Sequence, residues 1–210
     1  VVSFGIGVSD IMTPLECLGW SGYTARLIFY MVFPIVVAAI ITMAVALHRL
    51  LVGDRLSVAG VLHAAAPSLL KWAFLAYPMV TNVAFEAFPC HKFKVGGTQQ
   101  LGWLKADVSI ECGKQAHRDA IALAWLAIGL YPIGLLVLTA TLLCCARIAI
   151  VSRRPTPLST AIAFLHREYE PHMWWWELVE MFRRLLLIGL MQIMVRPGST
   201  LQIILGTVFC

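Results

Sequence analysis

The chain has 210 residues, of which 60% are hydrophobic and only 13% are charged, and its mean hydropathy is +0.83. Soluble domains carry about 25% charged residues, so this composition excludes a soluble globular protein and indicates a chain solvated by lipid. The net charge of +5 would suggest nucleic acid as the partner of a soluble protein. Here the basic residues lie in connecting segments and at the ends of apolar runs. We therefore expect anionic lipid headgroups as partners and no nucleic acid.

Apolar runs along the chain predict membrane-spanning helices. A span needs about 20 mostly apolar residues; four runs reach that length, and a fifth begins near the end of the sequence. The complete runs cover residues 24–47, 57–85, 120–151 and 173–195, and the partial run covers 201–210. The predicted fold is an all-α, polytopic transmembrane helix bundle with four complete spans and part of a fifth, preceded by residues 1–23. We expect further sequence before residue 1 and after residue 210.

Proline residues lie inside the first three predicted spans, at Pro34, Pro78 and Pro132. A proline removes one helical hydrogen bond and tends to kink the helix, so we expect three kinked helices. Pro67 also interrupts the second run, shortly before Lys71. Such kinks are ordinary packing features, but they also suit a pathway whose helices must bend.

The largest polar segment, residues 86–119, contains Cys90 and Cys112. Two cysteines in one loop predict a disulfide formed in an oxidising compartment. A further cysteine before the first span falls on the same side of the membrane, so we expect this side to face outward from the plasma membrane. His91 and His117 lie nearby, but the cysteine spacing matches no tight zinc motif, and we expect neither a metal nor another cofactor.

Three consecutive tryptophans, Trp174, Trp175 and Trp176, begin the fourth predicted span. Tryptophan is enriched at the membrane–water interface, where its ring is buried and its indole N–H stays wet. We therefore expect these residues to anchor the helix at one interface. A short helix over residues 160–169, apolar on one side, is predicted to precede them.

Charged residues follow the tryptophans within the same span. Glu177 and Glu180 precede Arg183 and Arg184, and spacings of three and four residues let Glu180 pair with either arginine on one helix face. Lys71 is a second intramembrane charge that needs a carboxylate or water, and either glutamate is a candidate partner. We predict an intramembrane charge network of these five residues. The alternative is a solvated helix start with snorkelling arginines and an interfacial Lys71.

Several motifs are shared with a known class of membrane proteins. They are Phe164–Pro171, Trp175-Trp176-Glu177 with Glu180 and Arg183-Arg184, Pro197-Gly198-Ser199-Thr200-Leu201-Gln202, Phe88-Pro89-Cys90, Leu104-Lys105-Ala106-Asp107, Cys112 and Tyr131-Pro132-Ile133-Gly134. With these motifs the chain, from about Cys17 to its end, resembles the membrane region of large protist and algal cell-surface proteins. It is also loosely similar to the fungal transient-receptor-potential-like (TRP-like) channel family. The resemblance implies a large Cys-rich extracellular part upstream and more spans downstream; it assigns no functional residues.

We therefore expect an integral membrane domain that is channel-like or transport-associated, with the charge network controlling gating or permeation. One alternative is a structural or receptor anchor for a large extracellular Cys-rich ectodomain; another is a subunit of a larger membrane complex. The expected partners are membrane lipids and other membrane subunits or a second copy of the chain. We expect no enzymatic activity, because the sequence has no HExxH, P-loop or GxSxG motif.

Overall fold

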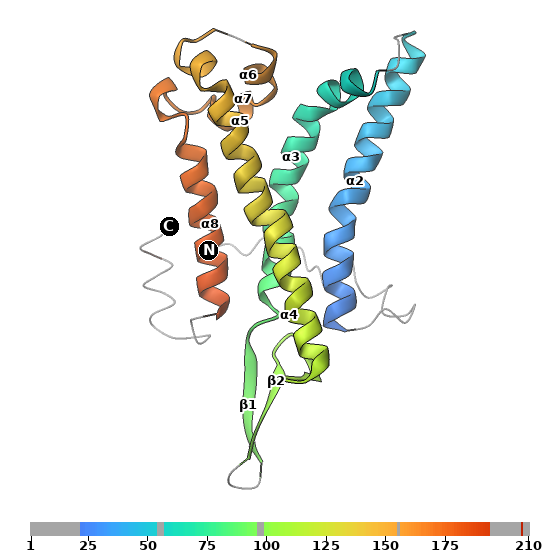
Figure 1. Cartoon of the computed structure of the whole chain (residues 1–210), viewed down its shortest axis with the longest axis vertical. Coiled ribbons are helices and arrows are strands. Elements are labelled where there is room, and N and C mark those ends of the chain that lie inside the picture. The colour runs from blue at the N-terminus through green and yellow to red at the C-terminus, as the bar shows by residue number, and fades with distance from the viewer. Residues whose placement is uncertain (1–21, 54–56, 96–98, 155, 194–206, 208–210) are drawn as a thin grey trace.

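The computed structural model describes residues 22–53, 57–95, 99–154, 156–193 and 207. It is mostly helical, and Figure 1 shows the long helices side by side with a small sheet projecting from one end of the bundle. We call this end the sheet side. The opposite end, where two short helices lie, is called the α6–α7 side.

Three helices are long and apolar enough to cross a membrane. They are α2 (Tyr23–Leu51), α3 (Val58–Phe85) and the run Gln115–Val151, which consists of α4 (Gln115–Ile128), the π-helix η1 (Gly129–Ile133) and α5 (Gly134–Val151). At 1.5 Å per residue the third run is about 55 Å long, well beyond a hydrocarbon core of about 30 Å. The first three predicted spans are thereby confirmed as helices.

The remaining helical elements begin on the α6–α7 side. They are α6 (Pro157–Ala161), α7 (Ala163–His166), the 3₁₀ turn η2 (Pro171–Met173) and α8 (Trp176–Ile193). The last of them, α8, runs back along the bundle toward the sheet side (Figure 1). Four charged residues within α8 distinguish it from the three apolar spans. The fourth span, 173–195, therefore stays a prediction, and the fifth run, 201–210, lies outside the described residues apart from residue 207.

A three-stranded antiparallel sheet corrects the all-α prediction. Its strands, in spatial order, are β1 (Cys90–Val95), β2 (Gln99–Leu104) and β3 (Asp107–Glu111). The polar segment also ends earlier than predicted, because α4 begins at Gln115 rather than at residue 120. Among the strand side chains whose burial is described, Leu104 and Ile110 join the core, whereas Phe93 and Val108 are exposed. The period-2 burial pattern that marks a strand is therefore weak.

The predicted disulfide is confirmed, since Cys90 is bonded to Cys112 with the two Cα atoms 6.5 Å apart. It joins the first residue of β1 to the residue that follows β3. The strands are therefore held together by a covalent bond as well as by the hydrogen bonds between them. This bond supplies the stability that so few buried side chains cannot.

Helix α3 is the central element of the bundle, because it contacts α2, α4, α5 and α8. Small residues permit close approach at two of these contacts. Ala120, Ala124 and Ala127 lie in the buried α3–α4 region, and a Cβ added at Gly189 on α8 would lie 3.1 Å from Cζ of Phe85. Small residues at helix interfaces are typical of membrane bundles.

Much of the helix surface is uncovered in the isolated chain. At most 28% of the apolar window of any candidate span is buried. A bundle of this kind needs lipid, further helices or a second copy around it, because so much apolar surface is unfavourable in water.

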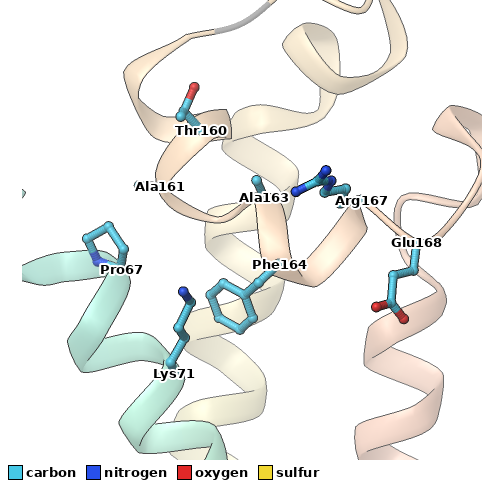
Figure 2. A pocket seen from close by; sticks show the side chains of 8 residues that line it. All are labelled: Pro67, Lys71, Thr160, Ala161, Ala163, Phe164, Arg167 and Glu168. Atoms are coloured by element: carbon cyan, nitrogen blue, oxygen red, sulfur yellow. The ribbon is translucent and has the colours of Figure 1, made fainter.

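Two side chains donate hydrogen bonds to backbone carbonyls at or near Pro34. Trp72 on α3 donates its Nε1–H to the Pro34 carbonyl on α2 at 3.0 Å, and the Tyr131 hydroxyl in η1 donates to the Met31 carbonyl. These donors belong to neighbouring helices and therefore also fix helix positions. Pro78 and Pro132 lie inside α3 and η1 as predicted, but Figure 2 shows α3 changing direction at Pro67.

We predict that removing the disulfide destabilises the sheet side. Changing Cys90→Ser together with Cys112→Ser, or reducing the bond, should lower the free energy of unfolding by about 2–4 kcal/mol, because the unfolded chain regains freedom. Thermal unfolding of the purified protein in detergent measures the loss. The matched control is Cys144→Ser with Cys145→Ser, since both thiols are free and exposed. An unchanged melting temperature after reduction would contradict the prediction.

Candidate functional site

The α3–α8 contact carries the main polar cluster of the bundle. Figure 1 shows α8 beside α3, with its first turn toward the α6–α7 side. Arg183 donates to Oε2 of Glu180 at 2.8 Å, one helical turn apart on α8. Their side chains are 36% and 19% exposed, so the pair is partly desolvated. Its strength should fall between that of a surface ion pair and that of a buried one.

Glu177 accepts a hydrogen bond from Tyr169, which precedes α8 in the chain. The Tyr169 hydroxyl donates to Oε2 of Glu177 at 3.1 Å, and this bond ties the segment after α7 to the first turn of α8. Sequence reasoning missed Tyr169, because a separation of eight residues across Pro171 matches no regular helical spacing.

Arg184 lies near Tyr77, another residue that sequence reasoning missed. Tyr77 on α3 is almost completely buried and packs against Leu135 and Met181. The Arg184 guanidinium is close enough to interact with the Tyr77 hydroxyl, but the contact falls short of a regular hydrogen bond. The Tyr77 hydroxyl has no hydrogen-bond partner among the described residues. A buried hydroxyl without a partner costs about 1–3 kcal/mol, so this position invites water, an ion or a ligand group.

The depth of this cluster follows from the parallel packing of α3 and α8. Gly189 packs against Phe85, the last residue of α3, whereas Met181 packs against Tyr77. Tyr77 precedes Phe85 by eight residues, which corresponds to about 12 Å along a helix. Arg184 and Tyr77 therefore lie well inside the length of the candidate span.

Lys71, the fifth member of the predicted network, lies apart from the glutamates of α8. It is exposed on α3 and makes no ion pair among the described residues. Together with Phe164, Arg167 and Glu168 it lines a separate cavity between α3 and the α6–α7 segment (Figure 2). The structure thus brings the charges of α8 together near Tyr77 and places Lys71 elsewhere.

Trp174 and Trp175 precede α8, which begins at Trp176 on the α6–α7 side. Trp174 packs against the buried cluster of Leu143, Ile162 and Leu165. Trp175 and Trp176 are partly exposed, with ring centroids 5.9 Å apart. This placement is compatible with the predicted interface anchor.

A second polar cluster connects the sheet to the helices. Arg26 on α2 forms an ion pair with Glu86, the residue that follows α3. Nearby, the buried Tyr23 hydroxyl donates to the Val83 carbonyl at 2.9 Å. Burial raises the pKa of Glu86, while the charges of Arg26 and then Lys105 act to lower it. These contacts bind the start of α2 to the end of α3.

Asp107, the first residue of β3, caps the N-terminus of α2. Its Oδ2 accepts the Tyr23 backbone N–H at 2.8 Å, and a carboxylate there also suits the positive end of the helix dipole. Gly22 makes this approach possible: its φ is +98°, and a Cβ at this position would lie 3.0 Å from Oδ2. Burial acts to raise the pKa of Asp107, but hydrogen bonds from Ser109 and Tyr23 outweigh it and lower the pKa.

His117 lies against the disulfide. Potential ligand atoms of Cys90, Cys112 and His117 all lie within 4.8 Å of one another. Disulfide sulfurs are not thiolates, however, and the histidine nitrogens are already used. Gly113 N–H donates to Nδ1 at 3.3 Å, so the proton sits on Nε2, which lies 3.2 Å from the Ala87 carbonyl. In this state the group is a packing and hydrogen-bonding cluster.

No protein-family model, curated protein or solved structure matches this chain. What the structure defines is a helical domain with three helices long and apolar enough to cross a membrane and a small disulfide-closed sheet at one end. Any function must therefore be argued from the polar clusters themselves.

We predict energetic coupling between Glu180 and Arg183. Glu180→Ala should destabilise the protein more than the double change with Arg183→Ala, because the single variant takes the Glu180 carboxylate away from a partly buried guanidinium. The coupling energy should be about 0.5–3 kcal/mol. Chemical unfolding of the four proteins of the cycle in detergent gives this value. The same cycle with Arg184 in place of Arg183 is the control and should give the smaller coupling; additive changes at Glu180 and Arg183 would refute the pair.

We predict a pH-dependent contribution from Asp107. Its folded pKa lies below the ordinary value of 3.8, so the stabilisation is fully present above that value and is lost as the pH falls through the folded pKa. Asp107→Asn should therefore melt at a lower temperature than the wild type at pH 7. The difference should shrink below pH ~4. Melting curves of both proteins over this range test the sign, and a difference that grows on acidification would contradict it.

Proposed function

We propose that this chain forms a channel-like or transport-associated membrane domain. The observation that carries the proposal is the buried Tyr77 hydroxyl, which has no hydrogen-bond partner among the described residues and lies beside Arg184 inside the length of a candidate span. Ionisable groups at this depth are costly and commonly mark ion or substrate pathways. The resemblance to the TRP-like channel family is a further reason for the proposal.

The helices around the cluster contain elements that can bend. α3 has Pro78 directly after Tyr77, and the α4–α5 run is interrupted by the π-helix η1, with Pro132 inside it. π-helical segments and prolines are common at helix bends and functional sites. In this proposal a small movement of α8 would shift α3, and through it α2 and α4, because α3 contacts all of them.

A second candidate function, a membrane anchor for an extracellular part, is favoured by the sheet side. Asp107 holds the start of α2, and the disulfide closes the sheet that carries Asp107. A load or signal arriving through the segment before residue 22 would thus reach both α2 and the sheet. An anchor would need this rigid attachment and no permeation path.

Ion flux through the full-length protein in liposomes distinguishes the two functions. The channel-like proposal expects flux in the wild type and a change of about tenfold in Tyr77→Phe and Arg184→Gln, because both alter the polar cluster on the path. The matched control is Arg147→Gln, an exposed arginine on α5. Absence of flux in correctly folded wild-type protein would refute the channel-like function and favour the membrane anchor. Equal effects in all three variants would refute the assignment of the Tyr77–Arg184 cluster to the path.

A further inference from the structure

Lys71 presents an electrostatic problem. It lies on α3 one helical turn after Pro67, where the helix changes direction, and beside the α6–α7 segment (Figure 2). Its side chain is exposed, and it has no ion-pair partner among the described residues. An ammonium group near the hydrocarbon is costly unless an anion or water stabilises it. The environment of Lys71 should therefore show what supplies the counter-charge.

Lys71 faces a cavity of about 330 Å³ between α3 and the α6–α7 segment. This volume is at the lower end of the roughly 300–1,000 Å³ typical of small-molecule sites. Figure 2 shows the side chains of Lys71 and Arg167 on opposite sides of Phe164, and both line the cavity. The carboxylate of Glu168 points away from Lys71, toward α8 (Figure 2). Thr160 also lines the cavity, but its hydroxyl donates to the Thr156 carbonyl at 3.0 Å and points away from Lys71 in Figure 2.

The position of Arg167 is fixed by the local structure of the α6–α7 segment. Thr156 and Ser159 form a reciprocal capping box at the start of α6. Ile162 and Leu165 are buried against α5, and the ring of Phe164 packs edge-on against Phe74 of α3 at 5.5 Å. The segment thus lies with its apolar side on the bundle and holds Arg167 at the rim of the cavity.

We infer that this cavity binds the phosphate group of an anionic membrane lipid, with Lys71 and Arg167 as its cationic ligands. Two cations suit a phosphate, because guanidinium and ammonium groups both form charge-assisted hydrogen bonds to its oxygens. Basic pockets between membrane helices are known to hold anionic headgroups. Phosphate at Lys71 would supply the missing counter-charge.

The surface next to Lys71 favours a lipid over a soluble phosphate. Leu75 and Met79 follow Lys71 at intervals of four residues and therefore share its helix face. Both are exposed, at 62% and 49%, and they continue from Lys71 along α3 toward its sheet-side end. An acyl chain attached to a phosphate at Lys71 can cover this apolar strip, which a free phosphate would leave bare.

This inference is independent of the proposed function, since it requires neither ion flux nor the Tyr77 cluster. The full-length protein in a neutral detergent can be titrated with phosphatidic acid, whose small headgroup fits the cavity, and followed by native mass spectrometry. Phosphatidylcholine is the lipid control and inorganic phosphate is the soluble control. We expect saturable binding of phosphatidic acid, and no competition from millimolar inorganic phosphate.

Charge-removing variants locate the site. Lys71→Gln with Arg167→Gln should weaken binding of phosphatidic acid by about tenfold or more. Arg147→Gln with Arg154→Gln removes the same charge from exposed positions at the end of α5 and just beyond it, and should change binding less than about threefold. Equal losses of phosphatidic acid binding in the two double variants would mean that the lipid is attracted non-specifically by positive charge, and would refute the assigned site.

Two further measurements keep the inference falsifiable if the first double variant does not fold. Lys71→Arg preserves the charge and should retain binding. A photoreactive phosphatidic acid on wild-type protein should label α3 near Leu75 and Met79. Labelling elsewhere, no binding at all, or full competition by inorganic phosphate would each overturn the lipid assignment.

Discussion

The packing of α3 against α2, α4, α5 and α8 is the interaction on which the rest of the bundle depends. In lipid, apolar contact between helices gains little, because acyl chains are equally apolar; helix positions rest on close packing and directional bonds. α3 provides both kinds of contact. Its sheet-side half carries the buried Val80, Val83 and Ala84, and its indole at Trp72 bonds to α2.

The two ends of α3 differ in how tightly they are held. On the sheet side, the Tyr23 hydroxyl, the Arg26–Glu86 pair and the cap by Asp107 lock α2, α3 and the sheet together. Toward the α6–α7 side, α3 changes direction at Pro67 and borders an open cavity instead of a close-packed helix. Movement of α3 would therefore hinge about its sheet-side end, because the directional contacts concentrate there.

Hydropathy and length predicted the three long helices, because a continuous apolar run in lipid has few alternatives to a helix. The disulfide also followed from the sequence, since Cys90 and Cys112 share one polar segment. The sheet did not: Asp107–Glu111 alternates polar and apolar residues, but a run of five residues is a weak strand signal, and Phe93 and Val108 remain exposed. Helical spacing predicted that the charges of α8 lie together. It could not predict that Tyr77 joins them, because Tyr77 belongs to another helix. Its role depends on the parallel packing of α3 and α8, which no local pattern encodes.

The parallel packing of α3 and α8 determines the depth at which the charges of α8 lie. Only about nine residues follow Arg184 in α8, which is roughly 13 Å of helix and less than half of a hydrocarbon core of about 30 Å. If α8 crosses the membrane, its arginines lie inside the bilayer, level with Tyr77, rather than at the headgroups. Arg184 is exposed in the described structure, so Tyr77 alone does not shield it. The shielding must then come from outside the described residues, for example from another subunit. The same added element would complete the polar surface that begins at Tyr77.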